Sequence, residues 1–163
     1  MKYRQALWLA PLLLIIHNLE EYLTMSAFTS RHVQDFPAFY AKIAMSSDQF
    51  TKALIIVTVL AVLLTFWGSI SEANGIGMFL AISTQAGLLI NAVQHIAASI
   101  WLGTYTPGVI TSIFLYLPVI SYLILRAFRE GYISKKLIIY SFILGIAMLL
   151  PVILLAKYIA LIL

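Results

Sequence analysis

Charged side chains are scarce in this chain of 163 residues, of which Asp, Glu, Lys and Arg make up only 10%. Hydrophobic residues make up 63%, whereas a typical soluble domain is about 45–50% apolar and about 25% charged. So few polar groups cannot cover a globule that faces water, and the composition therefore predicts a protein of the lipid bilayer. The same arithmetic excludes a disordered chain, a disulfide-rich secreted domain and a nucleic-acid reader, so we expect no nucleic-acid partner.

Cysteine is absent altogether. Thiolate catalysis and cysteine-ligated metals are therefore excluded. The ten Lys and Arg residues outnumber the six Asp and Glu residues, and in a membrane protein such an excess sets topology rather than binding polyanions.

Long apolar runs take the place of the missing polar residues. A spanning helix needs about 20 mostly apolar residues, and the stretches that qualify are 4–24, 50–71, 75–102, 107–128 and 136–160. We therefore predict an all-α, polytopic membrane protein, a bundle of five transmembrane helices in a single membrane domain over residues 1–163. The first stretch resembles a signal peptide, but Glu20 and Glu21 interrupt the place of a small-residue cleavage site.

Local signals predict where the spans begin and bend. A capping box is expected at 46–49, a turn at Asn74–Gly75, and an N-cap at Thr106 followed by proline at the first helical position of the fourth span. Prolines inside spans kink or locally open a helix. We expect this at Pro11, Pro118 and Pro151.

The only long connection, residues 25–49, follows the first span. Its apolar side chains at i, i+3, i+4 and i+7 predict a short amphipathic helix in the membrane interface, formed around Phe36, Phe39, Tyr40 and Ile43. A connector that rests on the bundle is the simpler interpretation, and a lid is the alternative. His32 lies in this polar stretch, where we expect it to be solvated.

A few polar side chains lie inside the predicted spans, where an ionisable group is costly and so indicates a functional site. The first span carries His17, Asn18, Glu20 and Glu21, and the third carries Asn91, Gln94 and His95. Counted at 1.5 Å per residue from the inner ends of two parallel helices, both groups lie about 20–27 Å deep. They are therefore expected to be level, toward the outer leaflet.

Two adjacent carboxylates in a low-dielectric layer need compensation, and no Lys or Arg lies within a span at this depth. Protonation, protonated histidines or a bound cation would supply it, and we favour the cation. Imidazoles and carboxylates together suit Zn²⁺ best, with Fe²⁺ or Mn²⁺ next. The candidate metal ligands are His17, Glu20, Glu21 and His95.

One glutamate would complete a three-ligand site with an open position, and the other would act as general acid or base. The candidate catalytic residues are Glu20, Glu21 and Asn91, and the residues that would orient ligands or substrate are Asn18, Gln94 and Tyr105. Asn and Gln within spans usually pack helices together, and for Asn18 and Gln94 this is the simpler interpretation.

These residues resemble the sequence motif of a known family. His17–Asn18–Leu19–Glu20–Glu21 is similar to the signature of the HXXEE-motif family of small prokaryotic integral membrane proteins, which have no assigned function and are proposed to be enzymes. The chain also resembles the family in Phe36–Pro37, in the Asn91 and His95 spacing, and at 105–108, so the resemblance covers roughly residues 10–120. It implies a prokaryotic inner membrane and a shared site at His17, Glu20, Glu21, Asn91 and His95.

Three functions stay open. The first is a metal-dependent intramembrane enzyme, a hydrolase or other acid–base catalyst, acting on a membrane lipid or an apolar small molecule. The second is a proton- or cation-coupled transporter or channel component using Glu20 and Glu21, and the third is haem binding by His17 and His95. Lys and Arg favour an N-terminus inside and a C-terminus outside, and homo-oligomerisation is left open.

Overall fold

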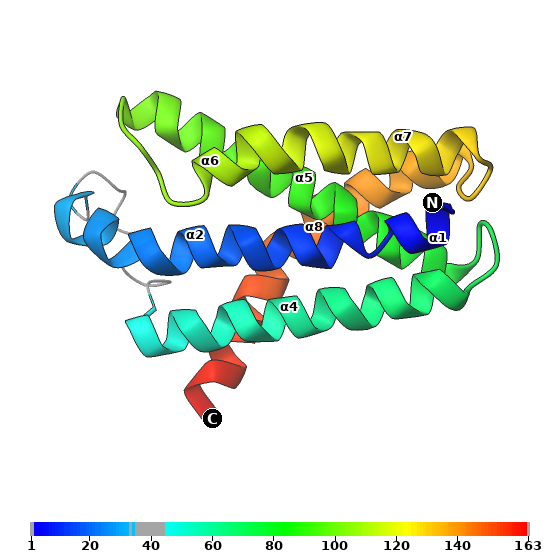
Figure 1. Ribbon diagram of the computed structural model, residues 1–163. Helices are drawn as coiled ribbons and strands as arrows, with labels where there is room; N and C mark the ends of the chain where they lie inside the picture. Colours follow the sequence, from blue (N-terminus) through cyan, green and yellow to red (C-terminus); the bar gives the residue numbers. More distant parts are fainter. Residues whose placement is uncertain (1, 33, 35–44, 163) are drawn as a thin grey trace.

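The computed structural model describes residues 2–32, 34 and 45–162, and all regular elements in these ranges are helical (Figure 1). Five helices are long and apolar enough to cross a membrane: Tyr3–His32, Ser47–Ile70, Ile76–Leu102, Val109–Arg129 and Lys135–Ile162. The predicted all-α fold with five spanning helices is therefore confirmed. The amphipathic helix expected around Phe36 to Ile43 lies outside the described residues.

The first span is interrupted near its start, as Pro11 predicts. Helix α1 covers Tyr3–Ala6 and α2 covers Leu9–His32. Pro11 has no N–H to donate to the Leu7 carbonyl four residues earlier, and its ring clashes with that carbonyl. The Leu7 carbonyl instead accepts from the Ala10 N–H at 3.1 Å, so the helix tightens and breaks at this point.

Helix α2 runs well past the predicted end of the first span. Residues 25–32, which we expected to be loop, continue the helix, and the His32 ring lies 4.9 Å from that of Phe28 rather than in a solvated loop. The expectation was wrong because hydropathy detects where the apolar layer ends, whereas polar residues can extend a helix into the headgroups. At this boundary the Thr24 hydroxyl donates to the Glu20 carbonyl within the helix.

The predicted capping box opens α4 (Ser47–Ile70). The Ser46 hydroxyl accepts from the Gln49 N–H at 3.2 Å, and the Gln49 side chain accepts from the Ser46 N–H at 3.1 Å. The turn at Asn74–Gly75 is also confirmed, with Asn74 at φ 59° immediately before α5 (Ile76–Leu102).

The fourth span consists of α6 (Val109–Thr111), a π-helical stretch at Ser112–Ile120 and α7 (Ser121–Arg129). Pro118 lies within the π-helical turns and cannot donate the α-helical hydrogen bond, so the predicted local opening is confirmed. The predicted N-cap at Thr106 is wrong. Gly108 at φ 83° precedes the helix, and the Thr106 hydroxyl donates to the His95 carbonyl at 3.0 Å instead.

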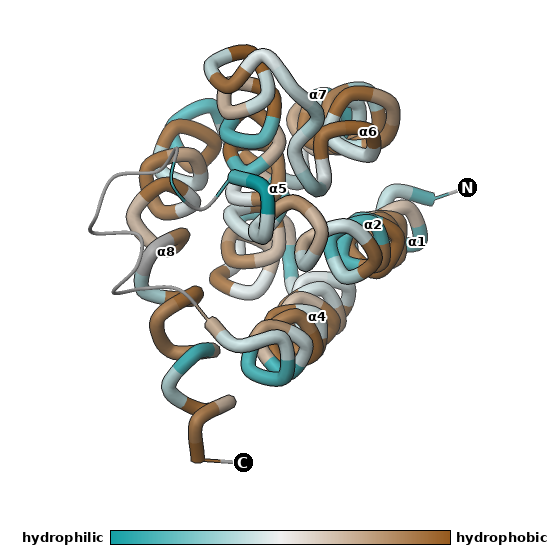
Figure 2. The backbone as a smooth tube through the Cα atoms, turned by 90° about the vertical axis from the view of Figure 1, so that its left-hand side faces the viewer, coloured by the Kyte–Doolittle hydropathy of each residue, from teal (hydrophilic) through white to brown (hydrophobic). Residues whose placement is uncertain are grey.

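Helix α5 lies at the centre of the bundle, where it packs against α4, α8 (Lys135–Ile162) and the fourth span (Figure 2). Helix α8 crosses the bundle obliquely, and its C-terminal end leaves the other helices beyond α4 (Figures 1 and 2). The backbones of α5 and α8 touch, since a Cβ on Gly145 would lie 2.8 Å from the Gly87 nitrogen. Helix α2 packs instead on α4 and the fourth span.

Candidate metal centre

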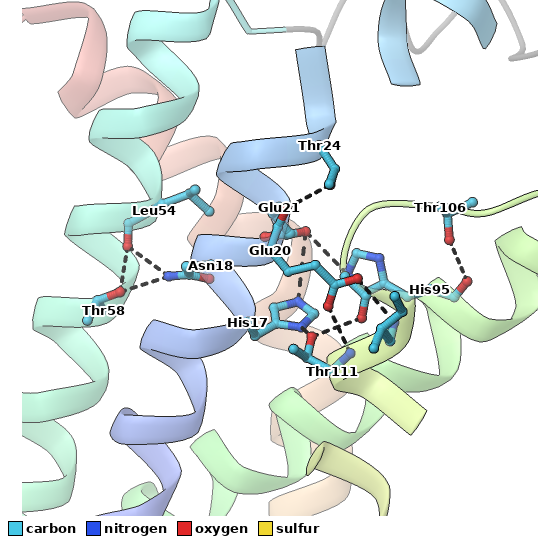
Figure 3. A network of polar contacts seen from close by, with 12 residues as sticks. His17, Asn18, Glu20, Glu21, Thr24, Leu54, Thr58, His95, Thr106 and Thr111 are labelled. Atoms are coloured by element: carbon cyan, nitrogen blue, oxygen red, sulfur yellow. Dashed lines mark hydrogen bonds and ion pairs between the residues drawn. The ribbon is translucent and has the colours of Figure 1, made fainter. Parts of the chain in front are cut away.

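Three side chains bring potential metal ligands to one point between α2 and α5 (Figure 3). His17 and Glu21 lie one turn apart on the same face of α2. The Glu21 Oε1 atom is 3.8 Å from His17 Nε2 and 3.3 Å from His95 Nε2, and the three ligand atoms all lie within 4.8 Å of one another. The structure therefore brings together the polar groups that we expected to be level.

The proton on His17 can be assigned from its neighbour. The Thr111 hydroxyl donates to the Gly108 carbonyl at 3.2 Å, and its oxygen lies 2.7 Å from His17 Nδ1. With the hydroxyl hydrogen directed to this carbonyl, its oxygen accepts from the ring, and we assign the His17 proton to Nδ1. The lone pair of His17 is then on Nε2, the atom that faces Glu21.

His95 is held in the same way from the loop before the fourth span. Its ring hydrogen-bonds the backbone of Pro107. Proline has no N–H, so the carbonyl must accept and the imidazole must donate. Neither His95 Nε2 nor His17 Nε2 makes a well-formed hydrogen bond to any described residue, although both atoms are buried. Two ring nitrogens and a carboxylate thus converge, with the Asn91 side chain within reach of the His17 ring, which is a suitable environment for a cation.

Glu20 points elsewhere, although it is the neighbour of Glu21. Its Oε1 atom accepts from the Tyr105 hydroxyl at 2.7 Å and the Ile110 N–H at 3.1 Å, and its Oε2 atom accepts from the Thr111 N–H at 2.8 Å. These N–H groups lie at the start of the fourth span. The first N–H groups of a helix have no acceptor within the helix, and the positive end of the helix dipole lies there. Glu20 caps that helix and is not one of the three converging ligands.

Tyr105 completes this cap. Burial raises the pKa of its phenol, so the hydroxyl keeps its proton near neutral pH and donates to Glu20. The capping of one helix by a carboxylate of another is a form of charge compensation that helical spacing alone does not reveal.

The remaining predicted residues separate into packing and cavity positions. The Asn18 amide donates to the Leu54 carbonyl at 3.2 Å and to the Thr58 hydroxyl oxygen at 2.8 Å, and so ties α2 to α4. Asn91 lines a cavity next to His17. Gln94 is exposed and does not line that cavity.

The chain is similar to a known protein family. Residues 8–123 match the model of a family described as a protein of unknown function with an HXXEE motif. The chain belongs to this HXXEE family. It is also similar to the uncharacterized protein YrkK of Bacillus subtilis (strain 168), with 30% identity over 144 residues and 87% of each chain covered. No solved structure matches the chain significantly.

The HXXEE motif divides its three named residues between two tasks. His17 and Glu21, which are four residues apart, face His95, whereas Glu20 holds the start of the fourth span. The motif thus describes one helical turn that joins a potential metal site to the helix packed beside it.

Three residues that the sequence analysis did not single out for the site contact the histidines. Thr111 holds His17, and Tyr116, which is fully buried, stacks on the His17 ring with centroids 4.6 Å apart. A Cβ on Gly108 would lie 2.6 Å from His17 Cε1 and 3.1 Å from His95 Cε1. Thr111 and Tyr116 are five residues apart, a spacing that a π-helix brings together and an α-helix separates.

An apolar cavity adjoins the HXXEE residues. It has a volume of about 430 Å³ between α2, α4, α5 and α8, within the range of about 300–1,000 Å³ that small-molecule sites occupy. His17, Asn18, Glu21 and Asn91 form a polar patch on its wall, and most of the other lining residues are apolar. The potential ligands therefore border a space that favours apolar molecules.

Proposed function

We propose that this protein is a metal-dependent intramembrane enzyme in which His17, Glu21 and His95 bind one divalent cation. The observation that carries the proposal is the pair of buried Nε2 atoms that face one carboxylate oxygen without making well-formed hydrogen bonds. Neighbouring ligands of a tetrahedral Zn²⁺ are about 3.3–3.5 Å apart, given metal–ligand distances of about 2.0–2.2 Å. The distances of 3.3 and 3.8 Å from Glu21 to the two rings are close to this spacing.

Zn²⁺ is the first choice of ion, and Fe²⁺ or Mn²⁺ would also accept this set of donors. Bound by three protein ligands, such an ion keeps a position open and supplies Lewis acidity for hydrolysis or a related acid–base reaction. Hydrolysis of an acyl substrate would add the hydroxyl of water to the acyl carbon and its proton to the leaving oxygen.

The protein's own residues have separate roles in this proposal. Thr111 and the Pro107 carbonyl hold the two rings, and Asn91, on the cavity wall, orients a polar group of the substrate. Glu20 is better suited to positioning than to proton transfer, because three donors already hold its carboxylate. The apolar cavity favours a lipid or another apolar molecule as substrate.

We also propose a prokaryotic inner membrane with the N-terminus inside. The support is the distribution of Lys and Arg around the spans, six on the predicted inner side and four on the outer side.

Metal analysis of purified protein tests the proposal directly. We expect near-stoichiometric zinc, iron or manganese in the wild type and its loss in the His17→Ala, His95→Ala double variant. His32→Ala is a matched control, because this histidine lies at the end of the same helix, and it should retain the metal. A wild-type protein without metal, or a double variant with unchanged content, would refute the proposal.

A proton-coupled transporter is the second candidate, and one observation favours it. Ser112 Oγ and Tyr116 OH are buried near the site without well-formed hydrogen bonds to described residues, as expected if water bridged them. Proton flux in proteoliposomes that Glu21→Gln abolishes would support this function. Haem binding has less support, because ring centroids 4.9 Å apart leave no room for a macrocycle between His17 and His95.

A further inference from the structure

The cavity beside the metal ligands is elongated. Its lining on α4 extends from Phe50 to Leu64, a length of about 21 Å at 1.5 Å per residue. A cavity of this length, with a volume of about 430 Å³, can hold an extended hydrocarbon chain.

The polar groups lie nearer one end of the α4 wall of this cavity. Asn18 bonds the Leu54 carbonyl, so the polar patch is level with Leu54. From there the α4 lining continues for about 15 Å to Leu64 on one side but only about 6 Å to Phe50 on the other. A ligand with its polar group at the patch thus has a long apolar section available for its tail.

The hydroxyls that line the long section of the cavity have no free hydrogen to donate to a ligand. The Ser83 hydroxyl donates to the Phe79 carbonyl at 2.8 Å, and the Thr84 hydroxyl donates to the Leu80 carbonyl at 3.0 Å. Both donors are therefore used within α5. The lining on the opposite wall includes Leu60 and Leu64, so a hydrocarbon tail meets an apolar surface on both sides.

The α5–α8 crossing forms one wall of the cavity. Gly87 and Gly145 line it with backbone atoms, and a Cβ on Gly145 would lie 3.2 Å from the Gly87 Cα. The two glycines thus let the backbones of α5 and α8 approach closely along this wall.

We propose that the substrate is a lipid with a long acyl chain, whose carbonyl end lies at His17, Glu21 and His95 and whose tail extends toward Leu64 and Leu80. The position of the reacting end rests on the proposed function. The shape and lining of the tail section are independent of it.

Photolabelling tests this assignment in phosphatidylcholine nanodiscs. The probes are palmitic acid with a diazirine near its methyl end and a hexanoic acid analogue. In Leu64→Trp the larger side chain should fill the far section of the cavity. We expect labelling of cavity peptides by the palmitoyl probe to fall about tenfold, a typical discrimination for a hydrophobic pocket, with the hexanoyl probe unaffected.

Leu63→Trp is the matched control, because Leu63 adjoins Leu64 but is 59% exposed on the outer face of the helix. Its labelling should change by less than about twofold. Leu80→Trp fills the same section from α5 and should reproduce the loss if Leu64→Trp fails to fold. Equal labelling of the cavity variants and the control, or labels confined to outward-facing residues, would overturn the assignment.

Metal content measured on the same samples separates the two proposals. Chain-length-dependent labelling without bound metal would retain the acyl-chain assignment and refute the metal-dependent enzyme. Bound metal, with labelling that does not change in the Leu64 and Leu80 variants, would retain the metal-dependent enzyme and refute the acyl-chain assignment.

Discussion

His17 is the residue on which most contacts of the site converge. Thr111 holds its Nδ1, Tyr116 covers one face of its ring, and Gly108 lies against its Cε1 edge. A ring so constrained presents Nε2 in one direction. Metal-binding histidines commonly have their second nitrogen fixed in this way, and the fixing partner affects metal affinity.

Removing the Thr111 hydroxyl should therefore weaken metal binding without removing a ligand. We expect Thr111→Val to lower zinc affinity about 10–100-fold, the usual effect of losing such a partner. Thr111→Ser retains the hydroxyl and should bind nearly as the wild type does. Competition with a chromophoric chelator measures both affinities, and equal affinities for the Val and Ser variants would contradict a role for the Thr111 hydroxyl in holding the His17 ring.

Gly108 offers a second test at the residue scale. Its φ of 83° is unfavourable for a side chain, and a Cβ there would press on His17 and His95. Gly103 is a matched control, since it has φ 62° but a Cβ added to it would meet nothing within 4 Å. Both Ala variants should lose about 1–2 kcal/mol of stability from backbone strain.

Gly108→Ala alone should also lose bound metal, because the two rings must move apart. Thermal unfolding and metal analysis of the two variants separate these effects. If Gly103→Ala lost as much metal as Gly108→Ala, the contact with the rings would not be the cause.

At the scale of elements, the start of the fourth span depends on a side chain from the first. Glu20 accepts hydrogen bonds from Tyr105 and from the Ile110 and Thr111 N–H groups. Adjacent helical residues point about 100° apart, so Glu20 can cap this helix while Glu21 faces the histidines. Neutralising Glu20 and neutralising Glu21 should therefore have different effects on stability and on bound metal.

Glu20→Gln should reduce stability by about 1 kcal/mol, because the charge that complements the helix dipole is lost, yet it should retain most of the metal. Glu21→Gln should lose the metal and leave the fourth span capped. Thermal unfolding of the chelator-treated proteins compares stability without the contribution of bound metal, and metal analysis of untreated samples gives occupancy. The reverse pattern would identify Glu20 as the ligand.

The elements themselves were largely predictable from the sequence. Hydropathy located all five spanning helices. Pro11 located the break between α1 and α2, and the Ser46–Gln49 capping box located the start of α4. Hydropathy could not locate the end of α2, because polar residues there remain helical. Thr106 looked like a cap, but its hydroxyl bonds a carbonyl of α5, a contact that depends on tertiary structure.

The candidate site was predictable only in part, for a related reason. Helical spacing within α2 and equal depth on α5 indicated that His17, Glu21 and His95 could meet. Spacing could not show that Glu20 points toward another helix. Thr111 and Tyr116 were missed because their common contact with His17 depends on π-helical turns, which an α-helical period does not reveal.

At the scale of the whole molecule, the site joins helices that do not all pack directly. Helix α2 rests on α4 and the fourth span, whereas α5 forms the centre of the bundle. His17, Glu21 and His95 meet across the space between α2 and α5, and Glu20 fastens α2 to the fourth span beside them. The cavity toward α4 and α8 can thus remain open while the ligand-bearing residues are held.

The orientation of this bundle in the membrane is open to a direct test, because the chain has no cysteine. Ser30 and Ser134 are exposed, the first at the end of α2 and the second just before α8, at opposite ends of the bundle (Figure 1). The excess of Lys and Arg near Ser134 predicts that this end faces the cytoplasm. A membrane-impermeant maleimide should therefore label Ser30→Cys in intact cells and Ser134→Cys only after permeabilisation. Labelling of Ser134→Cys alone in intact cells would invert the topology and place the candidate metal site toward the inner leaflet.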